Sequence, residues 1–380
     1  MRRFNKKIVF LALVSFVISA CSSSDSRNGG GSANCEQCIK EFNRKATLTH
    51  WADAIIIPNY ETYNQSIGSL KLKAENFTNS PSVENLALLK SALSNTYLLW
   101  QTVAPFELGK AKAVDLRDYT NVYPTNVKKI EQNIAQQKLE LNLPDTNTQQ
   151  GLPALDYLVN GLAQTPDKIV QKYQDDKYKK YLIAVVDRLQ YITQLVVDDW
   201  KNSYREKFIQ NDGTSAVSSV NVLANDYLLY YEKYMRNGKL RFPSGAATGK
   251  AYPEKVESYY NPELSFPLLI KSLQTMQNFF NGKRFSNQPK GLGFSSYLDK
   301  YHKITGGENI SDNVNRKYDE AIALCQKMMK EGETLENEIK TNNKAILELH
   351  DVIQSNIINL KVDMFQAMGV SVQYVDGDGD

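Results

Sequence analysis

The three histidines of this 380-residue chain are its first candidates for metal or acid–base chemistry. They are His50, His302 and His350, which lie too far apart in sequence to build a histidine-rich cluster from neighbours. A zinc peptidase needs H-E-x-x-H or an equivalent set of three ligands, and the sequence has no such motif. Glu348 and Asp351 stand near His350, but positions i and i+2 face different sides of a helix. This pattern favours a surface or partly buried helix position for His350.

Two of the four cysteines form a short motif, Cys35-x-x-Cys38. In a redox enzyme this motif stands at a helix that follows a strand, and no strand pattern precedes it here. A zinc site would need a second pair of ligands, and the next cysteine along the chain is Cys325. We therefore expect a small local disulfide or two free thiols at Cys35 and Cys38.

Oxygen atoms are the other source of ligands, because carboxylates and phenolates suit hard ions such as Fe(III) and Ca²⁺. Asp156, Glu107 and some of the 22 tyrosines could supply them. Three of those tyrosines have the spacing of one packed helical face, with the hydroxyls expected at its rim: Tyr227, Tyr230 and Tyr234. Residues 376–380 (DGDGD) start like a calcium loop but lack the distal glutamate, which indicates an acidic tail.

The elements that must position these residues are long amphipathic helices. Four segments have apolar residues at spacings of three and four, which mark one helical face: 83–100, 182–196, 220–234 and 346–364. Weaker helical stretches lie near 46–77, 126–138, 263–280 and 312–340. The only alternation that suggests a strand is a short one at 370–375. The sequence therefore predicts an all-α protein.

Turn-rich segments divide these helices. Glycine, proline and polar residues cluster in four places: 141–150, 211–215, 237–253 and 281–293. The break at 211 separates two halves of similar size, and each half has enough helix for a bundle of its own. We predict two packed helical bundles, an N-terminal one over 45–210 and a C-terminal one over 211–380.

Residues 1–20 have the pattern of a secretory signal peptide, with four basic residues, an apolar run over 8–18 and small residues before Cys21. The run is too short for a membrane span, which needs about 20 residues. A cysteine directly after small residues resembles the bacterial lipoprotein signal, in which Cys21 would be acylated and become the new N-terminus. Residues 21–44 then form a flexible, glycine- and serine-rich tether. We predict a lipid-anchored protein of the cell envelope, with outer-membrane sorting permitted by Ser22.

The formal net charge of +3 depends on that first segment. Without residues 1–20 the chain has 41 basic and 42 acidic residues. A nearly neutral chain has no overall electrostatic attraction to a phosphate backbone, so nucleic acid is not an expected partner.

Five pieces of the sequence, in their order and spacing, resemble the imelysin family, which is also called the insulin-cleaving membrane protease family. They are Ile57-Pro58-Asn59-Tyr60, Trp100 with Phe106 and Gly109, Tyr123-Pro124, the segment 151–158 (GLPALDYL) and Met368-Gly369-Val370. The resemblance extends from about residue 46 to the end of the chain. It implies an envelope protein built from two helical bundles and linked with bacterial iron acquisition more than with proteolysis.

The family signature, Gly-x-His-x-x-Glu, is altered in this chain. Gly151 is kept, but Pro153 stands in place of the histidine and Asp156 in place of the glutamate. Proline has no side-chain ligand atom, although it suits the first turn of a helix. The family also has a glutamate between the Trp and the Phe, whereas here Glu107 is displaced from that place. These departures predict that the motif is a structural relic, in which Asp156 bonds a backbone N–H of the first helical turn.

From the sequence we expect an imelysin-like lipoprotein that acts as a non-catalytic binding component linked to iron or metal acquisition. Iron or another metal ion is the candidate ligand, with Asp156 and Glu107 as the candidate ligand residues, and no cofactor is assigned. The membrane, through the lipid anchor, and an envelope protein are the candidate partners. The alternatives are a metallopeptidase of the imelysin type and a binding or scaffold module whose partner is unrelated to metal.

Overall fold

The computed structural model describes residues 42–373, and every regular element in this range is a helix. The all-α prediction is therefore confirmed, and the strand suggested at 370–375 is absent as far as Gln373. Within the described range, no helix combines the length and apolar character that a membrane span requires. The predicted signal peptide, Cys21, Cys35, Cys38 and the acidic tail lie outside the described residues.

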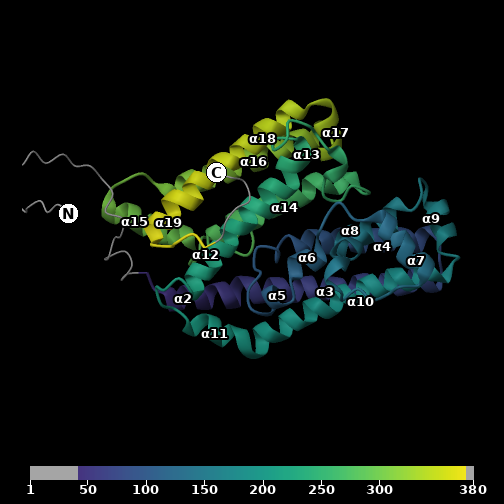
Figure 1. The fold of residues 1–380 in the computed structure, drawn as a ribbon. Coiled ribbons are helices and arrows are strands. Elements are labelled where there is room, and N and C mark those ends of the chain that lie inside the picture. Colours follow the sequence, from purple (N-terminus) through teal and green to yellow (C-terminus); the bar gives the residue numbers. More distant parts are fainter. Residues whose placement is uncertain (1–41, 374–380) are drawn as a thin grey trace, which may run out of the picture. The chain divides into compact units, whose positions relative to one another are not determined.

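The first half of the chain is built around three long helices, α3 (Ile57–Asn79), α4 (Val83–Trp100) and α10 (Asp176–Asp199), and α3 packs antiparallel against both of the others (Figure 1). The shorter elements of this half are α2 (Arg44–His50), η1 (Trp51–Ile56), α5 (Lys110–Ala113), α6 (Leu116–Thr120), α7 (Val127–Gln136), η2 (Pro144–Gln149), α8 (Gly151–Asp156), η3 (Tyr157–Gly161), α9 (Pro166–Lys172), η4 (Trp200–Tyr204) and α11 (Arg205–Gln210).

Helix α4 shows how the sequence determines these elements. The Ser82 hydroxyl accepts the Asn85 N–H at 3.2 Å and so caps the helix. The apolar stripe of the helix is buried at Leu86, Leu89, Leu93, Tyr97 and Trp100. Burial of such side chains is the main source of helix stability, at about 25 cal/mol for each Å² of apolar surface removed from water.

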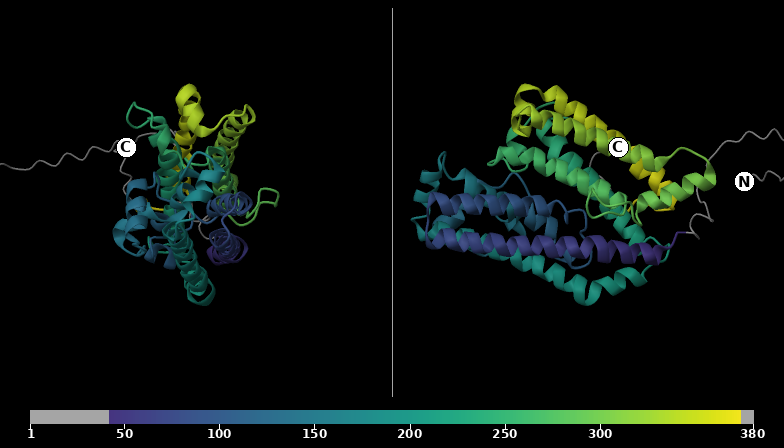
Figure 2. Two further views of the ribbon diagram at one scale, coloured as in Figure 1. Left: turned by 90° about the vertical axis from the view of Figure 1, so that its right-hand side faces the viewer. Right: turned by 180° about the vertical axis from the view of Figure 1, so that it is seen from behind.

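The second half is built around α12 (Ser219–Leu229), its continuation η5 (Tyr230–Arg241), and α14 (Ser265–Phe280), α16 (Ile310–Lys330) and α18 (Asn343–Ile357). Helix α16 packs between α14 and α18, and both views in Figure 2 show these green and yellow helices side by side. The shorter elements here are α13 (Phe242–Ser244), η6 (Pro253–Lys255), η7 (Pro262–Leu264), α15 (Phe294–Thr305), α17 (Leu335–Thr341), η8 (Ile358–Met364) and α19 (Phe365–Met368). Residues 42–373 belong to one compact unit, and the division at 210 and 211 stays a prediction.

Two sequence expectations in this half need correction. The loop expected over 237–253 begins only at Gly245, because η5 and α13 carry the helix through Ser244. The tyrosine stripe packs as expected, but the hydroxyls of Tyr227 and Tyr230 are buried instead of lying at a rim. Tyr227 donates to the Met276 carbonyl at 3.0 Å, and Tyr230 bonds the Ser272 hydroxyl, also at 3.0 Å. Polar partners on α14 thus make full burial of these phenols possible.

A buried ion pair of the second half is also bound by amides of the first half. The Lys239 ammonium donates to one oxygen of the Glu257 carboxylate, and both side chains are less than 5% exposed. The other oxygen of Glu257 accepts the amide of Asn121 at 2.7 Å and that of Gln101 at 3.0 Å. The charge of Glu257 is therefore compensated by one cation of its own half and two amides from the first half.

Removing one member of this pair should be far more costly than removing both. We expect Lys239→Met to lower the free energy of unfolding by about 3–5 kcal/mol, because it leaves a buried carboxylate without its cation. The double variant Lys239→Met/Glu257→Gln should recover most of that loss, since no buried charge remains. Urea unfolding measures the free energy of unfolding of the single and the double variant. Lys71→Met is the control, because it breaks an exposed pair with Asp187 and should cost at most about 1 kcal/mol. Equal losses in the single and double variants would contradict the pairing.

Candidate functional site

Helix α8 presents the altered signature, and its geometry depends on Gly151. This residue has φ of +74°, and a Cβ atom built on it would lie 2.3 Å from the carbonyl oxygen of Thr120. Only glycine fits so close to another backbone in this left-handed conformation. Pro153 lies in the first turn, where its missing N–H leaves no hydrogen bond unmade. Gly151 and Pro153 therefore have clear structural roles in beginning this buried helix.

Asp156 is the last residue of α8 and is only 2% exposed. Its Oδ2 accepts the backbone N–H of Tyr260 at 2.9 Å, and its Oδ1 accepts the Asn160 amide at 2.9 Å. The expected bond to an N–H of the first helical turn is not formed. The free N–H groups of α8 lie at its start, whereas Asp156 lies at its end. The carboxylate instead connects α8 to a loop that is 104 residues further along the chain.

The close approach of Tyr260 has its own cause in the sequence. Gly161 ends η3, and a Cβ atom there would lie 2.5 Å from the Tyr260 ring. The Tyr260 ring also packs on Tyr157, with their centroids 5.3 Å apart. Glycine at 161 thus lets the loop lie against η3, which brings the Tyr260 N–H within reach of Asp156.

Burial also changes the acidity of this carboxyl. Loss of hydration raises the pKa of Asp156 from its ordinary value of 3.8 to about 7, although the bonds from Asn160 and Tyr260 and the charge of Lys90 act in the opposite direction. The side chain can therefore exchange a proton near neutral pH, which is a property that acid–base sites also have.

A small cavity of about 170 Å³ lies beside Asp156. Pro153 and Asp156 line one part of it, and the rest is lined by Tyr123, Pro124, Thr125, Glu254, Val256, Ser258, Tyr259 and Tyr260. This wall combines aromatic rings, hydroxyl groups and two carboxyl groups. The cavity has room for water or a very small polar molecule.

The residues present here do not fit a metal ion. A protein metal site typically needs three or four ligands, and Pro153 offers none. Both oxygens of Asp156 already accept hydrogen bonds, and the nearby Glu257 is bound to Lys239. Across residues 42–373, no group of three or more His, Cys, Asp or Glu side chains is arranged to hold a metal.

Glu107, the other sequence-derived candidate, belongs to a different cluster. Its Oε1 accepts the Arg117 N–H at 2.8 Å, and its Oε2 lies 3.2 Å from the Arg117 guanidinium. The same guanidinium makes a two-pronged pair with Asp226, at 2.8 and 2.9 Å. Burial raises the pKa of Glu107, while the charge of Arg117 acts against that rise. Glu107 and Asp156 line different cavities and do not form one site.

Sequence reasoning missed the charged partners Arg117, Asp226, Lys239 and Glu257. One signal was available, since Asp226 stands directly before Tyr227 in a largely apolar helix. A charged residue in such a place is rarely buried without a partner. The identity of that partner was hidden, because Arg117 lies 109 residues earlier in the chain.

Two of the histidines have structural contacts. His50 Nε2 lies 2.7 Å from the Gly282 carbonyl oxygen. His350 is 8% exposed, and its Nδ1 lies 3.2 Å from the Asp351 carboxylate, so these neighbours do meet. Burial lowers the pKa of His350, which favours its neutral form. His350 is therefore more buried than the surface or partly buried helix position that the sequence indicated.

The short helix that begins at Gly151 is set among long packed helices, and together they form an all-α protein. The family model described as Imelysin (Peptidase M75) matches residues 56–355. The chain therefore belongs to the imelysin family, as the resemblance in its sequence indicated.

Two solved structures share this fold. One is described as a putative iron-regulated protein A precursor from Parabacteroides distasonis ATCC 8503, with a TM-score of 0.72 and 16% identity, and the match covers 85% of this chain and 94% of that one. The other is an imelysin-like protein from Psychrobacter arcticum 273-4, with a TM-score of 0.67, 17% identity, and coverage of 87% and 97%. The comparison with curated proteins gave no match. At these identities the likeness shows the fold alone.

The raised pKa of Asp156 predicts a pH dependence of stability. Because the folded protein holds this proton more tightly than the unfolded chain, the stabilisation linked to the proton is fully present below about pH 4 and is lost as pH rises through about 7. We expect the unfolding free energy of the wild type, minus that of Asp156→Asn, to fall by about 1 kcal/mol per pH unit between pH 5 and 6.5. Urea unfolding at several pH values measures this difference. A difference that rises with pH would show that the pKa is lowered instead.

Proposed function

We propose that this imelysin-family protein is a lipid-anchored, non-catalytic binding component of the cell envelope, linked to iron or metal acquisition. Its altered signature has a structural role, in which Asp156 connects α8 to the loop at Tyr260, and it is not a metal or acid–base centre. The observation that carries this proposal is the Asp156 carboxylate, both of whose oxygens are engaged by Tyr260 and Asn160. This structural role explains why a buried carboxyl group stands at Asp156 although Pro153 offers no imidazole beside it.

The link to iron has support from outside the site. The solved structure from Parabacteroides distasonis carries the description of an iron-regulated protein, and it shares the fold of this chain. Regulation by iron does not require that the protein itself hold the ion. A binding component that acts on an iron-containing ligand or on an envelope partner is compatible with a signature that lacks metal ligands.

The place in the envelope rests on the sequence before the described residues. A basic segment, a short apolar run and small residues lead directly to Cys21, and a polar tether follows. An acyl chain binds membranes by burying CH₂ groups, at about 0.8 kcal/mol each, so more than one chain gives a stable anchor.

The anchor can be tested on the mature protein isolated from its own membranes. We expect mass spectrometry to find an N-terminus at Cys21 that carries acyl chains. The variant Cys21→Ser should lose both the acyl mass and membrane association, because serine has no thiol to modify. A mature protein that begins at another residue would contradict the anchor and leave the binding role to be judged separately.

The structural role of Asp156 predicts that its loss affects stability and not metal content. We expect Asp156→Ala to lower the unfolding free energy by about 1–3 kcal/mol, because the Tyr260 N–H and the Asn160 amide lose their acceptor. Metal analysis of the purified mature protein, with titrations of Fe(II), Fe(III), Zn²⁺ and Ca²⁺, should give the same result for the variant and the wild type. The control is Asp187→Ala, which removes an exposed carboxylate.

Two results would contradict the structural role of Asp156. One is stoichiometric metal binding in the wild type that disappears in Asp156→Ala while Asp187→Ala retains it. The other is a peptidase activity of the wild type that chelators abolish and metal restores.

A further inference from the structure

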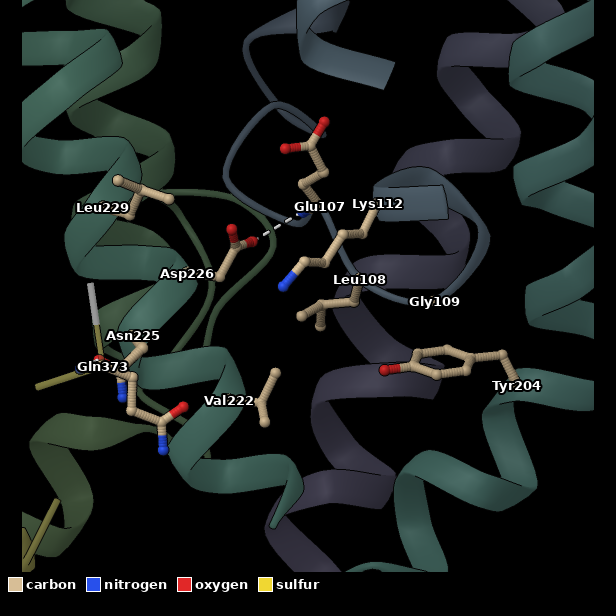
Figure 3. A pocket seen from close by; sticks show the side chains of 10 residues that line it. All are labelled: Glu107, Leu108, Gly109, Lys112, Tyr204, Val222, Asn225, Asp226, Leu229 and Gln373. Carbon is tan, nitrogen blue, oxygen red and sulfur yellow. Dashed lines mark hydrogen bonds between the residues drawn. The ribbon is translucent and has the colours of Figure 1, made fainter. Parts of the chain in front are cut away.

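The charged side chains at the centre of this protein have neighbours of the opposite sign. In a cavity of about 340 Å³, Figure 3 shows the Lys112 ammonium beside Asp226, which also binds Arg117. Two partly exposed cations of the second half differ, because neither forms an ion pair with any described residue. They are Lys271 of α14 and Arg284 of the loop that follows this helix.

The Arg284 guanidinium is held in place by neutral acceptors at the start of α3. Its Nε–H donates to Asn59 Oδ1 at 2.8 Å, and its Nη2 donates to the Pro58 carbonyl at 2.8 Å and to the Thr62 hydroxyl at 2.6 Å. Asn59 is 5% exposed, and its own amide donates to the Thr102 carbonyl at 3.2 Å. These acceptors engage three N–H groups of the guanidinium but leave its positive charge uncompensated.

Part of this guanidinium stays available. The two N–H groups of Nη1 have no acceptor among the described residues. The Glu61 carboxylate is close enough for its charge to act on Arg284, but it is paired with Lys201 at 2.9 Å. The Phe285 ring lies 4.7 Å from the guanidinium carbon and cannot neutralise a charge. Arg284 therefore offers a free donor nitrogen and an unmatched charge to a ligand.

Lys271 is a second cation of the same region. It lies two turns before Asn278 on α14, and the Asn278 amide donates to the Ser286 hydroxyl at 3.1 Å, so the loop of Arg284 returns along this face of the helix. Burial lowers the pKa of Lys271, and the charge of Arg284 lowers it further. The Lys271 ammonium also has no hydrogen bond to any described residue. Two cations thus lie within electrostatic range of each other, and neither has a carboxylate partner.

We propose that Lys271 and Arg284 bind a small oxyanion with two negative charges, of the phosphate type. Its oxygens would accept N–H groups from Nη1 of Arg284 and from Nζ of Lys271, and its charge would match the two cations. A carboxylate would leave one cation unmatched, and a metal cation would be repelled. Free phosphate and an organic phosphate monoester share this chemistry. The proposal goes beyond the proposed function and is independent of the role of Asp156.

Calorimetric titration of the mature protein with inorganic phosphate tests this site, with sodium chloride at equal ionic strength as the reference for screening. We expect saturable binding of one phosphate per chain, and Lys271→Met should weaken it about tenfold. Lys271→Arg keeps the positive charge and should retain most of the affinity. Glycerol 3-phosphate, titrated in the same way, distinguishes the sources, because tighter binding than that of phosphate indicates an organic monoester and weaker binding indicates the free ion.

Lys303 offers a matched control, because it is exposed, carries the same charge and has no ion pair with any described residue. Lys303→Met should bind phosphate as the wild type does. Lys271→Met should remain folded, which urea unfolding checks, because it removes a like-charge repulsion and leaves no partner unpaired. The proposal is overturned if the wild type shows no saturable phosphate binding at millimolar concentration, or if Lys271→Met and Lys303→Met bind it equally well. Neither result would bear on the anchor or on Asp156.

Discussion

The burial of the Arg117 guanidinium is the constraint on which the centre of this molecule depends. A guanidinium that is 3% exposed must have its lost hydration replaced by acceptors. Glu107 and Asp226 provide carboxylates, and the Ala104 carbonyl accepts the Nε–H at 2.6 Å. The Tyr234 ring lies 5.1 Å from the guanidinium carbon and adds a cation–π contact. The segment after α4 and helix α12 are thereby held together by one side chain.

The segment around η6 and η7 is held in a similar way by two carboxylates. One belongs to the first half of the chain and the other to the segment itself. Asp156 reaches out from the first half of the chain and accepts a backbone N–H at Tyr260. Glu257 reaches back and accepts amides of Gln101 and Asn121. Because both carboxylates are buried, each one specifies a single register between the loop and its neighbours. The altered signature thus belongs to a larger set of polar contacts that fix this loop.

The helices could be predicted because their signals are local. The apolar stripe from Leu86 to Trp100 lies within one element, and the structure buries it as expected. The role of Pro153 in a first helical turn also follows from local chemistry. The partner of Asp156 could not be predicted, because Tyr260 offers a backbone N–H, which every residue except proline has. The charged partners of Arg117 and Glu257 were hidden for a related reason, since sequence periodicity describes faces of helices and not which faces meet.

The π-helical hydrogen bonding of η5 has a consequence for insertions and deletions in this protein family. Bonds from i to i+5 place more residues in each turn than the 3.6 of an α-helix, so the side chains after Leu229 are rotated relative to a regular continuation of α12. Lys239, which pairs with Glu257, belongs to this rotated segment. If η5 kept its length but took regular α-helical bonding, each residue would turn by about 100° around the axis, and Lys239 would be rotated relative to Glu257. The length of this segment is therefore under a constraint that its amino-acid composition alone does not reveal.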